Sequence, residues 1–149
     1  MSYITWKDSL SIGVDKIDDE HRHLIKLINA VVAIAKESGS KKEFVKAMSL
    51  LREYTVIHFD NEENYMESIE YPHLFEHSQD HKVLKSSVKD FQARLYREEK
   101  IEYKEVLDFL KDWLVGHLLG HDMKIKEYME EMADSEPDVE EEDMDSESN

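Results

Sequence analysis

Two pairs of potential metal ligands, each separated by four residues, constrain the fold of this chain more than any other feature. They are His58 with Glu62 and His77 with His81. Residues four apart lie on one face of an α-helix, and both pairs are in phase with neighbouring apolar side chains. The pattern therefore predicts two amphipathic helices that direct imidazole and carboxylate groups into a shared core.

Helix start and stop signals divide residues 1–133 into an N-terminal loop and four helices. Asp18 is the expected N-cap of the first helix, Ser40 and Glu43 form a capping box for the second, and Pro72 is expected in the first turn of the third. The expected helices run from Asp18 to about Gly39, from Ser40 to about Ser68, from Tyr71 to about Arg97, and from about Glu102 past Met129. Short connections make neighbouring helices antiparallel, so the predicted fold is all-α, an up-down-up-down four-helix bundle.

In that bundle the candidate ligands meet at one end. They are His21 early in the first helix, His58 and Glu62 late in the second, His77 and His81 early in the third, and His117 and Asp122 in the later half of the fourth. A lone buried histidine is usually a core residue satisfied by a hydrogen bond, but several separate segments presenting such groups together indicate a two-metal site. Imidazole with carboxylate suits iron, zinc, copper or manganese, and the chain has no cysteine to offer a thiolate.

The spacing of the last pair is irregular. Asp122 follows His117 by five positions, which is a rotation of about 140° on a regular helix, whereas His121 is the i+4 partner. Helical geometry alone makes His121 a candidate ligand. A one-turn π-bulge next to Gly116 and Gly120 would instead bring Asp122 into the site.

Composition limits the possible partners and locations. The formal charge of −16 disfavours nucleic acid and anionic membrane surfaces as partners, and no apolar run is long enough to span a membrane. No secretion signal is visible and cysteine is absent, so we expect a cytoplasmic protein. Residues 134–149 hold nine acidic and no basic side chains, which predicts a disordered acidic tail that serves solubility more than the docking of a protein partner.

Four segments resemble the bacterial hemerythrins, over about residues 3–131. They are Ile17-Asp18-Asp19-Glu20-His21; His58-Phe59-Asp60-Asn61-Glu62-Glu63; Tyr71-Pro72 followed by His77 and His81; and Trp113-Leu114-Val115-Gly116-His117 ending in Asp122. The resemblance implies a bundle with a non-haem di-iron centre that binds dioxygen reversibly and is not an enzyme.

The same resemblance implies a division of the ligands. It places His77, His81 and His117 on one iron and His21 and His58 on the other, with Glu62, Asp122 and an oxo or hydroxo group bridging them. Dioxygen would then be held as hydroperoxide on the five-coordinate iron. The resemblance thus selects Asp122 over His121.

An oxygen-binding site of this kind needs an apolar wall, for which Trp113, Leu114 and Leu118 are the candidates, with Ile25 and Ile28 as weaker ones. All five also suit an ordinary bundle core. The remaining alternatives are a sensing module, an oxidase or peroxidase at the same centre, and a structural zinc bundle. A ferritin-like oxidase is disfavoured, because the only Glu-x-x-His match, Glu70 to His73, spans Pro72.

Overall fold

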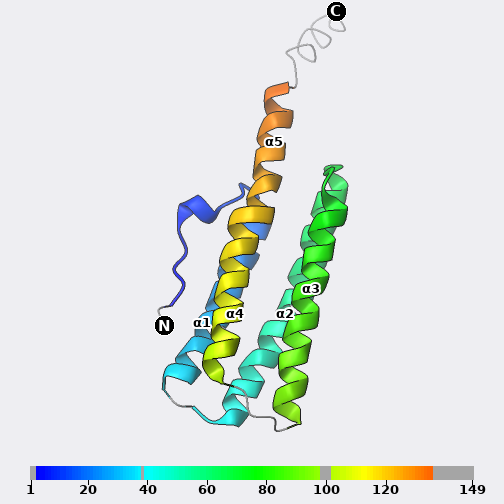
Figure 1. Cartoon of the computed structure of the whole chain (residues 1–149). Helices are drawn as coiled ribbons and strands as arrows, with labels where there is room; N and C mark the ends of the chain where they lie inside the picture. The colour runs from blue at the N-terminus through cyan, green and yellow to red at the C-terminus, as the bar shows by residue number, and fades with distance from the viewer. Residues whose placement is uncertain (1–2, 38, 98–101, 136–149) are drawn as a thin grey trace, which may run out of the picture.

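The computed structural model describes residues 3–37, 39–97 and 102–135, which form an antiparallel helical bundle (Figure 1). Its elements are a short 3-10 turn η1 (Asp8–Leu10), α1 (Asp15–Lys36), α2 (Lys41–Ser68), α3 (Leu74–Tyr96), α4 (Tyr103–Gly116), the π-helical segment η2 (His117–Asp122) and α5 (Met123–Ser135). Because α4, η2 and α5 follow one another directly, they make one long helical column, and the predicted four-helix bundle is confirmed.

The ends of the chain extend the bundle in two ways. The N-terminal segment runs along the outside of α1, and α5 projects beyond the other helices (Figure 1). Asp134 and Ser135, the first two residues of the predicted tail, belong to α5, and residues 136–149 lie outside the described part of the chain. Within the described residues, no helix is long and apolar enough to cross a membrane.

The core consists of apolar side chains at helical spacing from all four columns. Leu24, Ile28 and Val31 form the buried stripe of α1, and each is at most 1% exposed. The Phe44 ring stacks on Tyr103 with 4.1 Å between ring centroids, at the end of the bundle where α2 and α4 begin. Burial of such side chains supplies most of the stability of a helical bundle, since isolated helices are marginal in water.

Two of the predicted helix starts are correct and two are wrong. The backbone N–H of Glu43 donates to Ser40 Oγ (3.1 Å), so Ser40 is the N-cap of α2, and α4 begins directly after Glu102. The prediction of Asp18 as an N-cap is wrong, because α1 begins at Asp15. Buried in the first turn, the Asp18 carboxylate instead accepts hydrogen bonds from Ser11 Oγ and from the backbone N–H of Ile12 (2.9 Å).

The prediction of Pro72 in the first turn of α3 is also wrong. A tight turn precedes the helix, in which the backbone N–H of Leu74 donates to the carbonyl oxygen of Tyr71 (3.3 Å). Glu70, just before this turn, has a positive φ of 55°. The turn uses Pro72, whose fixed φ suits a turn as well as a helix start, and α3 begins two residues later at Leu74.

Two further contacts hold the N-terminal segment to α1. Asn29 pairs with the backbone of Ile4 through two hydrogen bonds, each 2.8 Å long, and the Arg22 guanidinium lies 4.5 Å from the centroid of the Trp6 ring. Together with Asp18 at the other end of the segment, these contacts cover one side of α1 close to the candidate site.

Candidate metal centre

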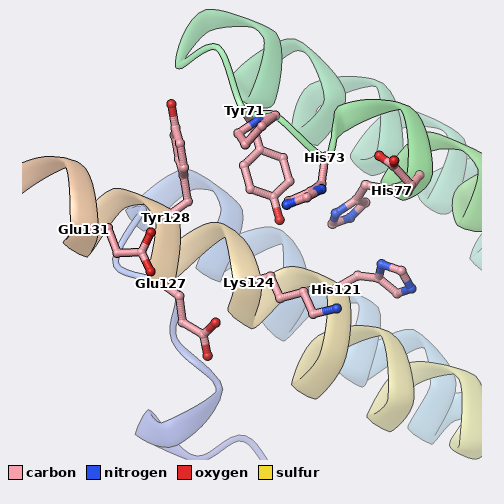
Figure 2. A pocket seen from close by; sticks show the side chains of 10 residues that line it. Tyr71, His73, His77, His121, Lys124, Glu127, Tyr128 and Glu131 are labelled. Atoms are coloured by element: carbon pink, nitrogen blue, oxygen red, sulfur yellow. The ribbon is translucent and has the colours of Figure 1, made fainter.

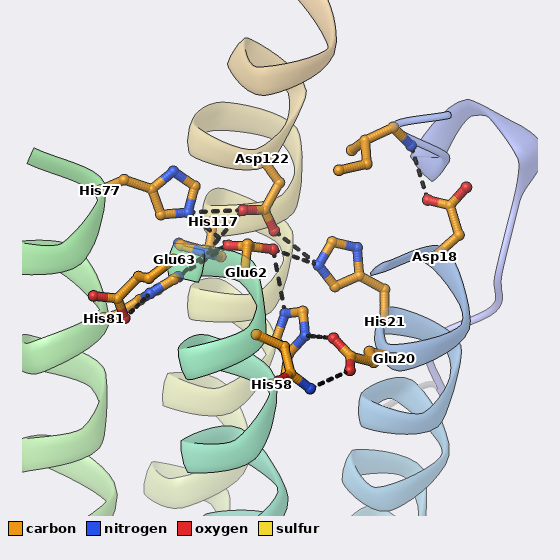
Figure 3. Close-up of polar contacts among 12 residues, drawn as sticks. Asp18, Glu20, His21, His58, Glu62, Glu63, His77, His81, His117 and Asp122 are labelled. Atoms are coloured by element: carbon orange, nitrogen blue, oxygen red, sulfur yellow. Dashed lines mark hydrogen bonds and ion pairs between the residues drawn. The ribbon is translucent and has the colours of Figure 1, made fainter. Parts of the chain in front are cut away.

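The seven predicted metal ligands converge in one buried cluster, as Figure 3 shows. Every column of the bundle contributes: His21 from α1, His58 and Glu62 from α2, His77 and His81 from α3, and His117 and Asp122 from η2. None of these residues is more than 4% exposed. The expectation that the four helices bring them to one end of the bundle is therefore met.

Glu62 lies between two groups of histidines. Its Oε1 is 2.8 Å from His77 Nε2 and 3.1 Å from His81 Nε2. Its other oxygen, Oε2, is 3.1 Å from His21 Nε2 and 3.3 Å from His58 Nε2. The carboxylate thus directs one oxygen to each group.

Asp122 divides its oxygens in the same way. Its Oδ1 is 3.0 Å from both His77 Nε2 and His117 Nε2, whereas its Oδ2 is 3.1 Å from His21 Nε2. Two carboxylates therefore connect a group of three histidines with a group of two. The donor atoms of Glu62, His77, His81, His117 and Asp122 lie within 4.8 Å of one another, and so do those of His21, His58 and Glu62.

Several metal-binding atoms in this cluster face one another, and some of them have no hydrogen-bond partner. Both Asp122 oxygens and His58 Nε2 are buried and lack a hydrogen-bond partner in the described part of the chain, although imidazole and carboxylate atoms lie about them. His81 Nε2 and His117 Nε2 are 3.0 Å apart, so they form a hydrogen bond only when one of the two nitrogens carries a proton. Buried polar atoms without partners are costly, and metal ions between the facing donors would satisfy them.

The spacing of the donors also fits a metal with ligands at right angles. Two ligand atoms at about 2.1 Å from an ion lie about 3.0 Å apart at a 90° angle and about 3.4 Å apart at a tetrahedral angle. Four of the pairs that face the three-histidine side are 2.8–3.1 Å apart: Glu62 Oε1 with His77 and His81, and Asp122 Oδ1 with His77 and His117. A fifth pair on this side, Glu62 Oε1 with His117 Nε2, is 3.7 Å apart. The four shorter distances fit ligands at about right angles, as in five- or six-coordination.

The π-helical segment explains how Asp122 reaches the cluster. The backbone N–H of Met123 donates to the carbonyl oxygen of Leu118, five residues earlier, so the predicted π-bulge is present. His121 consequently lies outside the cluster, with its side chain 39% exposed and its ring 5.7 Å from that of His117. His23 and His73 are also exposed.

Sequence reasoning missed three carboxylates that surround the cluster. His58 Nδ1 pairs with Glu20 Oε1 (2.9 Å), His81 Nδ1 with Glu63 Oε2 (3.1 Å), and His117 Nδ1 with Asp80 Oδ2 (2.6 Å). Each of the three acids is a sequence neighbour of one candidate ligand and contacts a different one on an adjacent helix. Adjacency to a ligand is a weak signal in a chain with 35 acidic residues, and Glu20 and Glu63 also lie in the segments that carry the family resemblance.

Electrostatics keep the carboxylates of the cluster charged. Burial raises the pKa of Glu62, but hydrogen bonds from the surrounding imidazoles outweigh burial and hold it well below its usual range. Burial likewise lowers the pKa of His21, but Asp122 and Glu62 raise it to about 9. The hydrogen bond from His117 lowers the pKa of Asp80. The site is thus a buried anionic cage in which imidazolium or metal ions balance the charge.

Aromatic and aliphatic side chains enclose the cluster toward the middle of the bundle. Trp113, Leu114 and Leu118 are buried in the main core, as are Ile25 and Ile28. The Trp113 ring lies 5.8 Å from that of His117. Phe59, which sequence reasoning did not select, stacks on His81 with 3.9 Å between ring centroids.

The fold and the site together define a class of protein: a four-helix bundle whose histidines and two shared carboxylates are suited to hold a pair of metal ions. Residues 12–129 match the family described as "Hemerythrin HHE cation binding domain". The chain belongs to the hemerythrin family.

Individual relatives agree with this assignment. The chain is 34% identical to a bacteriohemerythrin of Clostridium acetobutylicum, in an alignment that covers 84% of this chain and 98% of the relative. It is 31% identical to myohemerythrin-1 of Phascolopsis gouldii, with 81% and 90% covered. A crystal structure of wild-type hemerythrin superimposes with a TM-score of 0.77 at 27% identity and covers 82% of this chain and 94% of that one.

Proposed function

We propose that this protein holds two iron ions between its four helical columns and binds dioxygen reversibly. The observation that carries the proposal is the division of the Glu62 and Asp122 oxygens between three histidines on one side and two on the other. Its relatives are named hemerythrins, and the match covers most of the chain. Glu62, Asp122 and the five histidines are the proposed ligands.

The unequal number of donors supports binding of a small external ligand. The three-histidine side has five protein donors, since both carboxylates contribute one oxygen to it, and the two-histidine side has four. The side of His21 and His58 therefore has one more position available. A pair of iron ions held by the seven ligands would supply the electrons for reversible binding of dioxygen.

The residues around the ligands hold the imidazoles in place. Because Glu20, Glu63 and Asp80 accept hydrogen bonds at Nδ1, three of the imidazoles are fixed with the Nε2 lone pair directed into the cavity. We assign Trp113, Leu114 and Leu118 to the wall of the oxygen pocket, where their apolar side chains would exclude water from the available position.

The proposal is tested by visible spectra of the iron-loaded protein, recorded under anaerobic reduction, after air, and after deoxygenation. Metal content is measured on the same sample. Colour that appears with air and disappears on deoxygenation, at two irons per chain, is the expected result. Colour that never reverses, or a single colourless zinc per chain, would contradict it.

The proposal includes binding without turnover. A product that accumulates over many oxygen cycles would instead identify an oxidase or peroxidase at this centre. A cytoplasmic location also remains part of the proposal, and cell fractionation would test it. A partner that is lost on deletion of residues 134–149 would favour the sensing alternative.

A further inference from the structure

A pocket of about 360 Å³ lies on the outer side of the candidate centre, between the start of α3 and the column formed by η2 and α5 (Figure 2). Its floor includes His77, one of the proposed ligands. Glu76, Glu127 and Glu131 line it as well. The pocket thus reaches from exposed carboxylates down to a ligand of the three-histidine group.

The charges of the lining suit a cation. The three carboxylates are opposed by one ammonium group, that of Lys124. All four of these side chains belong to exposed residues, which can move at little cost. Carboxylate-lined mouths raise the local concentration of cations and the rate at which they arrive.

An imidazole that the candidate centre does not use lies at the inner end of this pocket. The His121 ring is 5.5 Å from that of His77 and 5.7 Å from that of His117, centroid to centroid. The π-helical segment places His121 at the pocket while Asp122 enters the cluster. His121 therefore offers a nitrogen donor next to two proposed ligands.

The pocket reaches one ligand directly, because His77 is part of its lining. His77 is 1% exposed, and its Nδ1 has no hydrogen-bond partner within the described residues, unlike the Nδ1 atoms of His58, His81 and His117. Tyr71 lines the same pocket. Burial raises the pKa of its phenol, and the negative charges of Asp122, Glu127 and Glu76 raise it further. Tyr71 therefore shares the pocket lining with Glu76 and Glu127.

We propose that this pocket is the route by which divalent iron reaches the centre, with Glu76, Glu127 and Glu131 attracting the ion and His121 binding it first. The ion then passes to His77 and His117, whose rings adjoin that of His121. This inference rests on the proposed di-iron function, because it concerns how that metal arrives. It assigns a role to His121, which by spacing alone competes with Asp122 as a ligand.

A second acidic hollow provides the competing route and the control. Asp60, Glu63 and Glu67 line it on the α2 side, and Glu63 contacts His81. Asp60 and Glu67 are exposed, so their replacement removes the same charge as replacement of Glu127 and Glu131. A comparison of the two double variants therefore separates local attraction from the effect of net charge.

The experiment measures the rate at which metal-free full-length protein takes up Co²⁺ or, anaerobically, Fe²⁺, by stopped-flow absorption at low ionic strength. Glu127→Gln/Glu131→Gln should slow uptake about tenfold, and Asp60→Asn/Glu67→Gln should leave it within about twofold of wild type. Lys124→Gln should speed uptake, with Lys126→Gln as its control. Final stoichiometry should stay at two ions per chain in all four variants.

Histidine variants test the first imidazole separately. His121→Ala should slow uptake without lowering stoichiometry, while His23→Ala, which removes an exposed imidazole beside Tyr54, should not slow it. Equal rates in all variants, or a slower rate in Asp60→Asn/Glu67→Gln alone, would overturn the inference and leave the di-iron proposal intact. A wild-type protein that takes up no pair of metal ions would overturn the proposed function itself.

Discussion

Replacing Asp80 with asparagine removes one negative charge and leaves the shape of the side chain almost unchanged. In the structure Asp80 accepts a hydrogen bond from His117 Nδ1 at 2.6 Å, the shortest of the three carboxylate contacts to proposed ligands. A carboxylate at Nδ1 orients the imidazole and makes Nε2 a better donor to a metal. We therefore expect Asp80→Asn to weaken the ion held by the three-histidine group.

The size of the effect follows from the exposure of Asp80. Loss of such an outer partner typically lowers metal affinity by about 10- to 100-fold, or about 1.4–2.7 kcal/mol. The Asp80 side chain is 30% exposed, so solvent screens part of its charge and the lower end of that range applies. The corresponding Glu20 side chain is 11% exposed, and Glu20→Gln should weaken the ion on the two-histidine side by a larger factor.

The assay is a chelator competition titration with Co²⁺, which resolves two successive binding constants. Asp90→Asn provides the control, because Asp90 is an exposed acid on the same helix as Asp80. Asp80→Asn should change one binding constant and Asp90→Asn neither. If the two variants bind both ions with the affinity of wild type, the argument from the Nδ1 contact fails.

Four other perturbations have defined outcomes. Glu62→Ala removes a proposed bridge and should reduce metal content below two ions per chain; retention of two irons with an unchanged spectrum would show that the ligand assignment is wrong. Ser40→Ala removes the N-cap of α2 and should lower the free energy of unfolding in urea by about 1 kcal/mol. Deletion of Leu119, which is 55% exposed, reduces the spacing of His117 and Asp122 from five residues to the four of a regular helix. Both side chains should then still face the cluster, and the metal content of the purified variant should equal that of wild type. Chelation of the metal should lower the midpoint of thermal unfolding, since metal ions bind the folded state, and an unchanged midpoint would argue against a buried pair of ions.

Helical periodicity made most of the site predictable. His58 with Glu62 and His77 with His81 repeat at a spacing that only a helix places on one face, and the antiparallel order of the helices then brings both pairs to one end. The same reasoning could not decide between His121 and Asp122. That choice depends on a local π-helical segment. The five-residue spacing allowed such a segment, and the family resemblance selected Asp122.

Contacts between distant segments were not predictable in the same way. Asp18 has the residue type and position of an N-cap, but its carboxylate binds Ser11 and Ile12, because the preceding segment folds back over the start of α1. Asp80 and Glu20 contact histidines 37 and 38 residues away in sequence. Such pairs depend on how adjacent helices are rotated, and a hydrophobic pattern defines that rotation only approximately.

The outer carboxylates also affect the redox balance of the proposed centre. Five acids lie in or around the cluster: Glu20, Glu62, Glu63, Asp80 and Asp122. Two ferric ions bring two more positive charges than two ferrous ions, and in a buried site those charges are stabilised by nearby negative groups. The acids that orient the imidazoles thus also favour release of electrons to dioxygen. Asp80→Asn should therefore raise the reduction potential of the iron pair, whereas a loss of orientation alone would weaken metal binding and leave the potential unchanged.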